Sequence, residues 1–437
     1  MTKQQHRHPP LELATGQKTR NPGSEIPARV ALYVHVPFCR ARCAYCDFNT
    51  YAGLESLLPA YVAAACREIE VAGDRWGYLA VPTVYLGGGT PSILPIELLA
   101  ELFQASRSAF YVPEDAEISL EANPGTVGRE ELHGLREVGI NRLSLGVQST
   151  HDDELHLLGR IHTWGQAVET VNVARASGFD NLNLDFIFGL PGQTLARWRE
   201  TLKTALSLEP EHLSLYALSV EEGTPLARQI ASGELPAPDE DLAADMYELA
   251  EEMLTGAGFF HYEISNWARR GDTGQLTTIE PRDWWPESQT SSETVSPYVC
   301  RHNLTYWRNE LWLGVGAGAH SWLNGRRWAN VRHPQEYIAA LTQGDEPGSA
   351  PACVPPGEAE TIDKQLEMGE TMMMGLRLAE GMDDARFRAR FGVGLEAAFG
   401  KVLARLQDQG LLSWDGHTTR LTARGRLLGN QVFASFV

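Results

Sequence analysis

Three cysteines of this 437-residue chain lie within eight positions of one another. Cys39, Cys43 and Cys46 form a C-x3-C-x2-C arrangement, although the whole sequence contains six cysteines. That spacing arises by chance in roughly one in a thousand chains with this cysteine content. Three thiolates leave one position open at a tetrahedral zinc ion or at an iron–sulfur cube, as a substrate-binding metal centre requires. The spacing predicts such a centre, with a zinc site completed by Asp47 as the alternative.

Other residues with chemical potential stand where strands are expected to end. The glycine run Gly87–Gly89, followed by Thr90, would let the backbone approach a ligand closely. Asp185 lies inside an apolar stretch, where a buried carboxylate needs partners or a polar ligand. Three more polar candidates occupy similar positions, namely Glu121, Gln148 and Arg160. Each alone is more often a structural hydrogen-bonding residue, but together they predict one pocket at a barrel mouth.

Six short apolar runs alternate with helical patterns, and these elements must position the candidates. Strands are expected over Ala31–Val36, Thr83–Leu86, Glu117–Glu121, Arg142–Gln148, Leu182–Phe188 and His212–Leu218. Helices are expected over about Leu57–Arg75, Pro95–Phe110, Arg129–Val138, Gly165–Ser177, Thr194–Leu208 and Glu240–Ala257. Such alternation implies right-handed crossovers and a parallel sheet. Six units are fewer than the eight of a full barrel, so an incomplete barrel and a doubly wound sheet both fit the pattern.

The regular alternation ends after Ala268, and the chain divides into five expected segments. These are a flexible leader at 1–28, a barrel core at 29–268, a disordered loop insertion at 269–299, a segment completing the core at 300–348 and a C-terminal domain at 358–437. The last segment has helical patterns followed by a β-hairpin around Asp415–Gly416. That order is typical of a small winged-helix-like domain.

Charge and composition argue against several classes of function. The formal net charge of −19 disfavours nucleic-acid binding, because phosphate backbones repel an acidic chain. No stretch has the roughly 18 uninterrupted apolar residues of a membrane span, and the N-terminus lacks the apolar core of a secretory signal. Arg40 and Arg42 lie between the clustered cysteines and are expected to favour thiolates. The cysteines therefore indicate a metal-binding protein of the reducing cytoplasm rather than a disulfide framework.

The cysteine loop after the first expected strand, and the order of the later motifs, resemble the radical S-adenosylmethionine (SAM) superfamily. In that family the loop holds a 4Fe-4S cluster whose open iron binds the amino and carboxylate groups of SAM. The stretches Tyr33–Cys39, Leu145–Gln148 and Asp185–Gly192 narrow the resemblance to the coproporphyrinogen-oxidase-like branch. The resemblance implies an α/β fold, an incomplete parallel (β/α)6 barrel with a smaller, mostly helical C-terminal domain. It also implies a SAM site formed by Tyr33, Tyr45, Gly88, Gly89, Thr90, Glu121, Gln148, Arg160 and Asp185.

Two groups within this branch differ at one position. The oxygen-independent coproporphyrinogen III oxidases have a further cysteine two residues after the third cluster ligand, whereas this sequence has Phe48. The stretch His302-Asn303-Leu-Thr-Tyr306-Trp307 matches the H-N-x-x-Y-W haem-binding pattern of the HemW group of haem chaperones. Imidazole is a common axial ligand of haem iron, and aromatic rings offer flat faces to a porphyrin. The resemblance therefore implies a haem site at His302, Asn303, Tyr306 and Trp307.

Alternatives to this haem site stay open. His320, within a glycine-rich stretch, is a rival ligand, and the glycines around it would equally suit a backbone lid over SAM. Cys300 could ligate haem or react with a haem vinyl group, whereas Cys66 and Cys353 are expected to be structural.

The function implied by the resemblance is haem binding and delivery to haem-requiring membrane enzymes such as respiratory complexes. Its cofactors would be a 4Fe-4S cluster, SAM and haem. The protein would have no coproporphyrinogen oxidase activity. The alternative is a radical SAM enzyme that oxidatively decarboxylates coproporphyrinogen III or acts on another tetrapyrrole, since the expected SAM site is of the catalytic type. A homodimer is compatible with either function.

Overall fold

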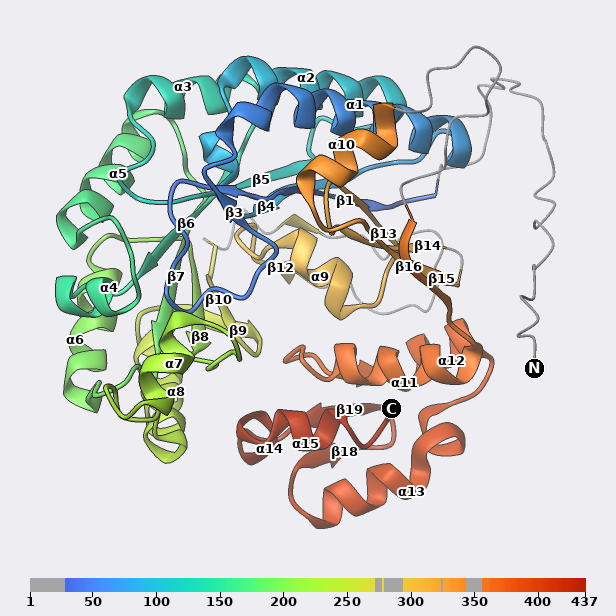
Figure 1. Cartoon of the computed structure of the whole chain (residues 1–437). Helices are drawn as coiled ribbons and strands as arrows, with labels where there is room; N and C mark the ends of the chain where they lie inside the picture. Colours follow the sequence, from blue (N-terminus) through green and yellow to red (C-terminus); the bar gives the residue numbers. More distant parts are fainter. Residues whose placement is uncertain (1–27, 272–276, 279–293, 324, 343–355) are drawn as a thin grey trace, which may run out of the picture.

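The computed structural model describes residues 28–271, 277–278, 294–323, 325–342 and 356–437 (Figure 1). The expected leader lies outside the described residues apart from Ala28, as do Cys353 and most of the expected insertion at 269–299. Within the described part, no helix is both long and apolar enough to cross a membrane.

A twelve-stranded sheet with a parallel centre forms the larger part of the molecule. Its strand order is β16-β15-β14-β13-β1-β4-β5-β6-β7-β8-β10-β9. The six predicted strands are its consecutive central members, β1 (Ala31–Val36), β4 (Thr83–Gly88), β5 (Glu117–Ala122), β6 (Arg142–Gln148), β7 (Leu182–Phe188) and β8 (His212–Ala217). Each neighbouring pair among them is parallel. The predicted α/β fold, an incomplete barrel of six units, is confirmed.

Helices between these strands cover the outer face of the curved sheet (Figure 1). They are α1 (Leu58–Trp76), α2 (Ile96–Ala109), α3 (Arg129–Glu137), α4 (Asp152–Leu157), α5 (Trp164–Ala176), α6 (Leu195–Leu206), α7 (Pro225–Ala231) and α8 (Glu240–Gly256), with short 3-10 turns η1 (Glu55–Leu57) and η2 (Pro91–Ile93). Thr163, Thr194 and Asp239 begin α5, α6 and α8 by accepting a backbone amide of the first turn. Such caps satisfy amides that the helix itself leaves unpaired.

Both edges of the sheet carry strands that the sequence did not predict. At one edge, β13 (Trp312–Val315) runs parallel to β1 and is followed by antiparallel β14 (His320–Leu323), β15 (Arg326–Asn330) and β16 (Pro356–Thr361). At the other edge, β10 (Asn266–Arg269) and β9 (Phe259–Glu263) are antiparallel. The remaining elements of these regions are a separate pair, β11 (Thr277–Thr278) and β12 (Thr294–Val295), and α10 (Pro334–Thr342). Short strands give a weak periodic signal, which explains why they were missed.

The C-terminal part is mostly helical and has an apolar core of its own. Its elements are α11 (Lys364–Gly375), β17 (Met382–Asp383), α12 (Asp384–Phe391), α13 (Leu395–Asp408), β18 (Leu412–Trp414), β19 (Thr418–Leu421), α14 (Ala423–Leu427) and α15 (Gly429–Phe433). Met372, Phe387, Leu403 and Val432 are buried in its core. The expected hairpin forms at Asp415, whose side chain accepts the amides of His417 and Thr418. Helix α12 was not predicted.

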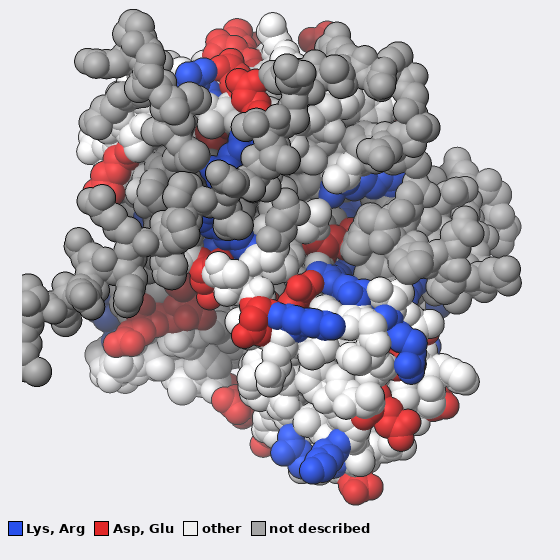
Figure 2. Space-filling view, turned by 90° about the vertical axis from the view of Figure 1, so that its right-hand side faces the viewer, with Lys and Arg blue, Asp and Glu red and all other residues white. Residues whose placement is uncertain are grey.

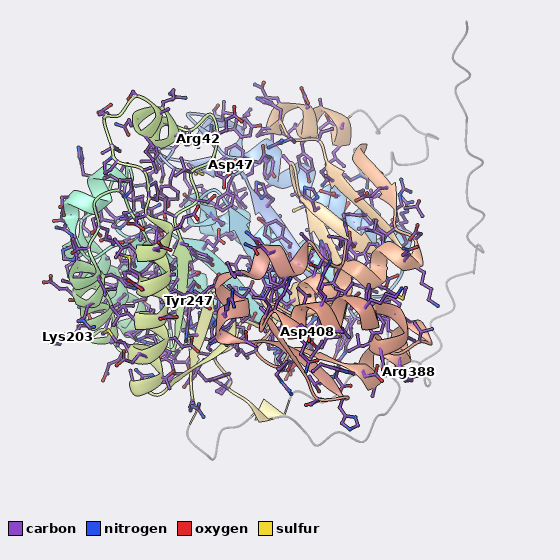
Figure 3. All side chains as sticks on the ribbon, turned by 90° about the horizontal axis from the view of Figure 1, so that it is seen from below. Arg42, Asp47, Lys203, Tyr247, Arg388 and Asp408 are labelled. Carbon is purple, nitrogen blue, oxygen red and sulfur yellow. The ribbon has the colours of Figure 1, made fainter. Side chains whose placement is uncertain are left out.

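The charges of this C-terminal part are mixed. In Figure 2, positive and negative side chains lie next to each other on its visible face. Arg388 pairs with Asp384 at 2.9 Å and Arg386 with Glu380 at 3.3 Å. Nucleic-acid binding needs a positive patch, and the described residues on this face do not form one. Figure 3 shows Arg42 at one edge of the molecule and Arg388 towards the other.

Helix α9 (Arg301–Trp307) lies between the sheet and the C-terminal part (Figure 1). The carboxylate of Glu117, at the start of β5, accepts the backbone amides of Arg301 (2.9 Å) and His302 (3.0 Å). Just after the helix, the side-chain amide of Asn309 donates to the Thr371 hydroxyl at 2.9 Å. The helix that carries the expected haem motif is thus attached to both parts of the chain.

Candidate functional site

Cys39 ends the short strand β2 (Phe38–Cys39), and Cys43 and Cys46 lie on the loop that leads from it to the parallel strand β3 (Tyr51–Ala52). The middle of the loop is held at Ala44. Its amide donates to the carbonyl of Leu158 at 3.0 Å, and its carbonyl accepts the amide of Leu226 at 2.9 Å. The loop therefore packs against segments that follow β6 and β8, at the mouth of the barrel.

The end of the loop is held at Asn49. Its side-chain amide donates to the carbonyls of Ala317 (3.0 Å) and Arg332 (2.9 Å). A Cβ atom at Gly318 would lie 2.6 Å from this amide nitrogen. The glycine-rich stretch before His320 therefore supports the cysteine loop from behind. It does not line the cavity described below, so the alternative of a backbone lid over SAM has no support here.

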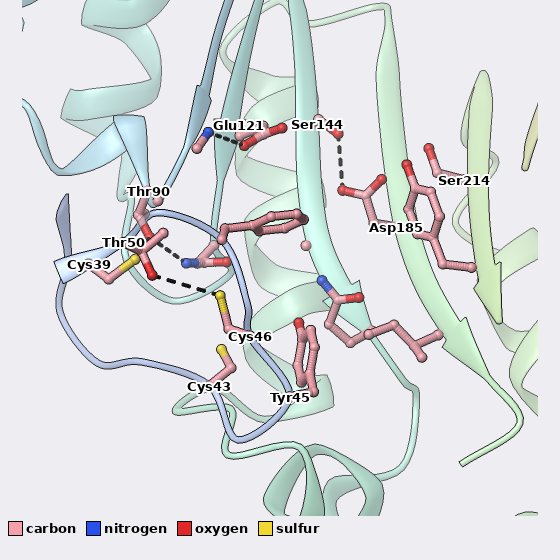
Figure 4. Close-up of a pocket in the computed structure, with 18 of the residues that line it drawn as sticks. Cys39, Cys43, Tyr45, Cys46, Thr50, Thr90, Glu121, Ser144, Asp185 and Ser214 are labelled. Carbon is pink, nitrogen blue, oxygen red and sulfur yellow. Dashed lines mark hydrogen bonds between the residues drawn. The ribbon is translucent and has the colours of Figure 1, made fainter. Parts of the chain in front are cut away.

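Each thiol contacts one polar side chain. Thr50 Oγ1 lies 3.8 Å from Cys46 Sγ (Figure 4). Thr90 Oγ1 lies 3.7 Å from Cys39 Sγ, and Arg160 Nη1 lies 3.3 Å from Cys43 Sγ. Arg42 instead donates to the backbone carbonyl of Cys46, and Arg40 is exposed. The arginine placed to stabilise a thiolate is therefore Arg160 rather than the two within the loop.

This arrangement suits a multi-iron cluster better than a single ion. Among the residues that the structure describes, no three His, Cys, Asp or Glu side chains converge closely enough to hold one metal ion. A zinc ion needs four ligands at about 2.0–2.3 Å, so the alternative with Asp47 loses support. In an iron–sulfur cube each thiolate binds a separate iron atom. Three thiols around a shared space fit that donor set.

A cavity of about 410 Å³ opens beside the cysteine loop. This volume lies within the range of roughly 300–1,000 Å³ that is usual for ligand sites. Its wall contains the three cysteines together with Tyr45, Gly88, Gly89, Thr90, Glu121, Gln148, Arg160 and Asp185. Tyr33 does not line it. Its hydroxyl lies 2.9 Å from His35 Nδ1 and its ring lies behind that of Tyr85, 6.3 Å away between centroids, so its expected contact with SAM has no support here.

Two glycines leave no room for side chains next to the cluster loop. Gly88 has a φ of +113°, and a Cβ atom there would lie 2.4 Å from the ring of His35. A Cβ atom at Gly89 would lie 2.6 Å from the carbonyl oxygen of Phe38 and 3.0 Å from Cys39 Sγ. Glycine is therefore required at both positions for the backbone to pass this close to the thiols.

Glu121 faces the cavity from β5. Its carboxylate accepts hydrogen bonds from the Tyr85 hydroxyl (2.9 Å) and from the Gly88 amide (3.1 Å). Burial and the nearby charge of Asp185 raise the pKa of Glu121 to about 7. A cationic group bound here would favour the ionised form.

Asp185 faces the cavity from β7. It accepts hydrogen bonds from the Ser144 hydroxyl (3.1 Å, Figure 4) and from the Asn183 side-chain amide (2.7 Å). Burial raises the pKa of Asp185. Paired carboxylates with raised pKa values in a cavity are typical of a binding or catalytic site.

Gln148 lies at an irregular end of β6, and Arg160 lies in the loop after α4. The pairing of β6 with β7 shifts register between Gly146 and Gln148, and Gln148 has a φ of +70°. Such a bulge redirects a side chain, here into the cavity wall. Arg160 Nη2 donates to Asn123 Oδ1 (2.5 Å) and to the carbonyl of Gly146 (2.7 Å). Its buried Nε has no hydrogen-bond partner in the described structure.

Several residues of the cavity wall were not predicted from the sequence. They include Tyr85, Asn123, Arg142, Ser144, Asn183, Ser214 and Tyr216. The alternation of side chains along a strand indicates those that lie on strands, because side chains two residues apart point to the same face. Asn183, two before Asp185, and Ser144, four before Gln148, follow that spacing.

The expected haem residues do not share one surface. His302 and Tyr306 contact each other, with 3.0 Å between Nε2 and the hydroxyl. Asn303 lines the cavity. The ring of Trp307 instead packs against Arg377 of the C-terminal part, with 4.3 Å between the guanidinium carbon and the ring centroid. The structure thus brings two of the four together.

The other candidates lie apart. His320 is exposed at the start of β14. Cys300 is fully buried, with its Sγ 3.6 Å from Glu117 Oε1, and burial raises its pKa to about 12. Burial likewise raises the pKa of Cys66, on α1, to about 11. High thiol pKa values argue against reactivity at either position.

The chain is similar to known proteins in both sequence and fold. Residues 33–205 match the radical SAM superfamily and residues 362–428 match the HemN C-terminal domain. The heme chaperone HemW of Mycobacterium tuberculosis is 39% identical over 404 residues, covering 92% of this chain and 93% of that protein. HemW of Bacillus subtilis is 36% identical over 406 residues, covering 93% and 98%. The radical SAM enzyme coproporphyrinogen III oxidase (HemN) of Escherichia coli has the same fold, with a TM-score of 0.77 at 24% identity over 94% of this chain and 90% of that one.

Proposed function

Because this chain belongs to the HemW family within the radical SAM superfamily, we propose that it is a haem chaperone, which binds haem and passes it to haem-requiring proteins. The sequence identity extends over nearly the full length of these relatives, so it includes both the barrel and the C-terminal part. The cysteine loop and the His302–Trp307 motif also resemble this family.

The identity of one cavity residue bears on whether the protein is a chaperone or an oxidase. Phe48 lines the cavity and is 69% exposed. The similar oxidases have a cysteine at this place. Among the described residues that line the cavity, the thiols are those of Cys39, Cys43 and Cys46. A phenyl ring supplies neither a metal ligand nor an acid–base group, which favours a protein without the oxidase activity.

We assign the cluster and SAM to the cavity. Cys39, Cys43 and Cys46 would hold a 4Fe-4S cluster, which when bound supplies an open iron position for the amino and carboxylate groups of SAM. Glu121 and Asp185 would face the positive charges of SAM, which would favour their ionised forms against the effect of burial. Gly88, Gly89 and Thr90 would contact SAM with their backbone, and Tyr45, Gln148 and Arg160 would complete the wall.

We assign haem to His302, with Asn303, Tyr306 and Trp307 around it. Burial lowers the pKa of His302 to about 3, so its imidazole is neutral, the form that binds metals. The donor therefore fits haem iron. The ring is enclosed, however, so haem needs a local opening of the structure around α9.

We further propose that the acceptors are membrane enzymes that use haem and that the protein works in the cytoplasm. The five cysteines that the structure describes are free thiols, as a reducing compartment would keep them. We keep 29–268 with 300–348 as the barrel domain and 358–437 as the C-terminal domain. The separate apolar core of the latter supports this division.

Haem titration and a turnover assay on one anaerobically reconstituted batch test the proposal. A chaperone should bind haem at about one per chain, should transfer it to a haem-free acceptor, and should leave coproporphyrinogen III unchanged. His302→Ala should alter or abolish the Soret band, because a methyl group cannot replace the imidazole ligand. His320→Ala, with its exposed ring on β14, is the control and should bind haem normally.

The second candidate is a tetrapyrrole-modifying radical SAM enzyme. The observation that favours it is the cavity itself, where two carboxylates and an arginine stand opposite a cluster loop. If wild-type protein binds no haem and converts coproporphyrinogen III with stoichiometric cleavage of SAM, this candidate replaces the chaperone.

A further inference from the structure

Both ring nitrogens of His302 already have partners. The residue is 1% exposed. Its Nδ1 lies 3.0 Å from the Thr83 hydroxyl, and its Nε2 lies 3.0 Å from the Tyr306 hydroxyl. Tyr85 stacks on one side of the ring at 5.2 Å, and Tyr306 meets it edge-on at 5.1 Å. Iron can reach a nitrogen of this ring once one of the two hydroxyl groups has moved away.

The tautomer of the ring decides which nitrogen is available. A neutral imidazole has one N–H donor and one nitrogen with a lone pair, and the lone pair binds metal. A hydroxyl group either donates or accepts, so Thr83 and Tyr306 satisfy the ring in both tautomers. The nitrogen left for iron is therefore the one whose hydroxyl partner can withdraw.

The two hydroxyl groups differ in their freedom to move. Thr83 begins β4, is 1% exposed and pairs with Glu117 of β5 in the sheet. Its hydroxyl cannot withdraw far while the sheet stays intact. Tyr306 is half-buried on the seven-residue helix α9, with its ring edge-on to Trp312 at 5.2 Å. Rotation of this one side chain releases Nε2 while β4 stays paired with β5, and the opening that haem needs lies around the same helix, α9.

We propose that His302 binds haem iron through Nε2, that Thr83 is a positioning residue that accepts the Nδ1–H, and that the Tyr306 hydroxyl holds the ligand position until haem arrives. The inference rests on the proposed function, because it concerns how the same haem site is built. Metal-binding histidines usually donate their second ring N–H to a fixed acceptor, which sets both tautomer and ring orientation. Thr83 supplies that acceptor from a strand 219 positions away in the sequence.

The first test uses haem-free protein. Nitrogen-15 NMR of the histidine rings, with His302→Ala to identify the signals, should show a proton on Nδ1 and a lone pair on Nε2. Thr83→Val should change the Nδ1 signal. Thr201→Val, at another buried threonine (1% exposed), should not. A wild-type ring protonated at Nε2 overturns the proposal.

The second test measures haem affinity and the Soret band. Thr83→Val should lower haem affinity about 10- to 100-fold, the usual effect of losing the second partner of a metal-binding histidine. Thr83→Ser keeps the hydroxyl and should restore both affinity and spectrum. Wild-type behaviour of Thr83→Val, or failure of Thr83→Ser to restore binding, would overturn the positioning role. Absence of haem binding in the wild type would instead refute the proposed function, and the ligand role of His302 with it.

The third test concerns Tyr306. Tyr306→Phe frees Nε2, so haem association should become about fivefold faster, the factor that one ordinary hydrogen bond contributes. The final spectrum should stay that of the wild type. Tyr247→Phe is the matched control, because that hydroxyl lies 3.2 Å from Nε2 of a different histidine, His261. Loss of the Soret band or slower association in Tyr306→Phe would make Tyr306 a haem ligand and overturn its role as a placeholder.

Discussion

Tyr85 and His302 stack their rings at a centroid distance of 5.2 Å and an angle of 28°. The hydroxyl group of the same tyrosine donates a 2.9 Å hydrogen bond to Glu121. Tyr85 therefore forms a shared wall between the cavity assigned to SAM and the residues assigned to haem. A single side chain, that of Tyr85, thus contacts both Glu121 and His302.

We expect SAM affinity to rise with pH through about 7, because the ionised form of Glu121 attracts a cation and burial holds its pKa near that value. Asp185, Arg142 and Tyr85 also face this carboxylate. Tyr85→Phe removes a hydrogen bond that lowers the pKa of Glu121, so the midpoint of the profile should move to higher pH. Calorimetry between pH 6 and 8.5 measures both profiles. A pH-independent affinity in the wild type would contradict the assignment, and Glu121→Gln should give weak, nearly flat binding.

In the ligand-free protein, the contribution of Glu121 to stability should be lost as the pH rises from 5 to 8. Glu121 has a higher pKa in the folded than in the unfolded chain, so its contribution is fully present below about pH 4.5 and is lost as the pH passes about 7. The expected change is on the order of 2 kcal/mol for this group. Glu68, buried with three hydrogen bonds, has a pKa raised to about 7 by burial and adds to the slope.

Urea unfolding at several pH values checks this prediction. The comparison is between slopes, because Glu121→Gln also changes hydrogen bonds at every pH. Between pH 5 and 8 the unfolding free energy of the variant should fall less, or rise more, than that of the wild type. An equal slope in both proteins would mean that Glu121 stays ionised in the folded chain.

Local patterns were sufficient to predict the parallel core and much of the cavity. β6 and β7 have the predicted bounds, since runs such as Leu182–Phe188 are mostly apolar, as strands buried on both faces are. The cysteine loop and Asp185 follow from residue type and strand position. The alternation on β6, β7 and β8 would also have found Ser144 and Ser214.

Local patterns of this kind do not predict contacts between segments that are distant in the sequence. The position of α9 depends on Glu117, which accepts amides from residues 184 and 185 positions away. Nothing near His302 in the sequence indicates Thr83 or Tyr85 as its neighbours. Tyr33 was assigned to SAM from the motif, but its strand places it behind Tyr85. Long-range packing, rather than local propensity, determines these relationships.

Single Cys39→Ser, Cys43→Ser and Cys46→Ser variants should each lose most of the iron and sulfide after anaerobic reconstitution. No fourth cysteine lies on the loop to replace a lost ligand, and a serine hydroxyl is a poor substitute for thiolate. Cys66→Ser, on α1 outside the cavity, should reconstitute like the wild type. Full cluster content in any of the three loop variants would refute the cluster assignment.

Gly89→Ala should impair cluster assembly without unfolding the barrel. The added methyl group would lie 2.6 Å from a backbone oxygen and 3.0 Å from Cys39 Sγ, so the loop must shift. Overpacking of this kind costs about 1–3 kcal/mol. Gly165→Ala is the control, because its nearest neighbour is 3.8 Å away and it lies in helix α5, where alanine is favoured. Iron content and circular dichroism separate the two effects, and normal iron content in Gly89→Ala would show that the loop tolerates the methyl group.

Gln148→Gly should separate stability from SAM binding. Gln148 has a φ of +70°, a left-handed conformation that costs a residue with a Cβ atom about 1–2 kcal/mol relative to glycine. The variant relieves that strain, so its unfolding free energy should be unchanged or higher, although the side chain is lost from the cavity wall. SAM affinity should fall, because the bulge that strains the backbone also directs this amide towards the ligand. Gln193→Gly, a buried glutamine bonded to the amides of Gly189 and Leu190, should instead lose stability. A Gln148→Gly protein that binds SAM normally would mean that the strained backbone serves the fold alone.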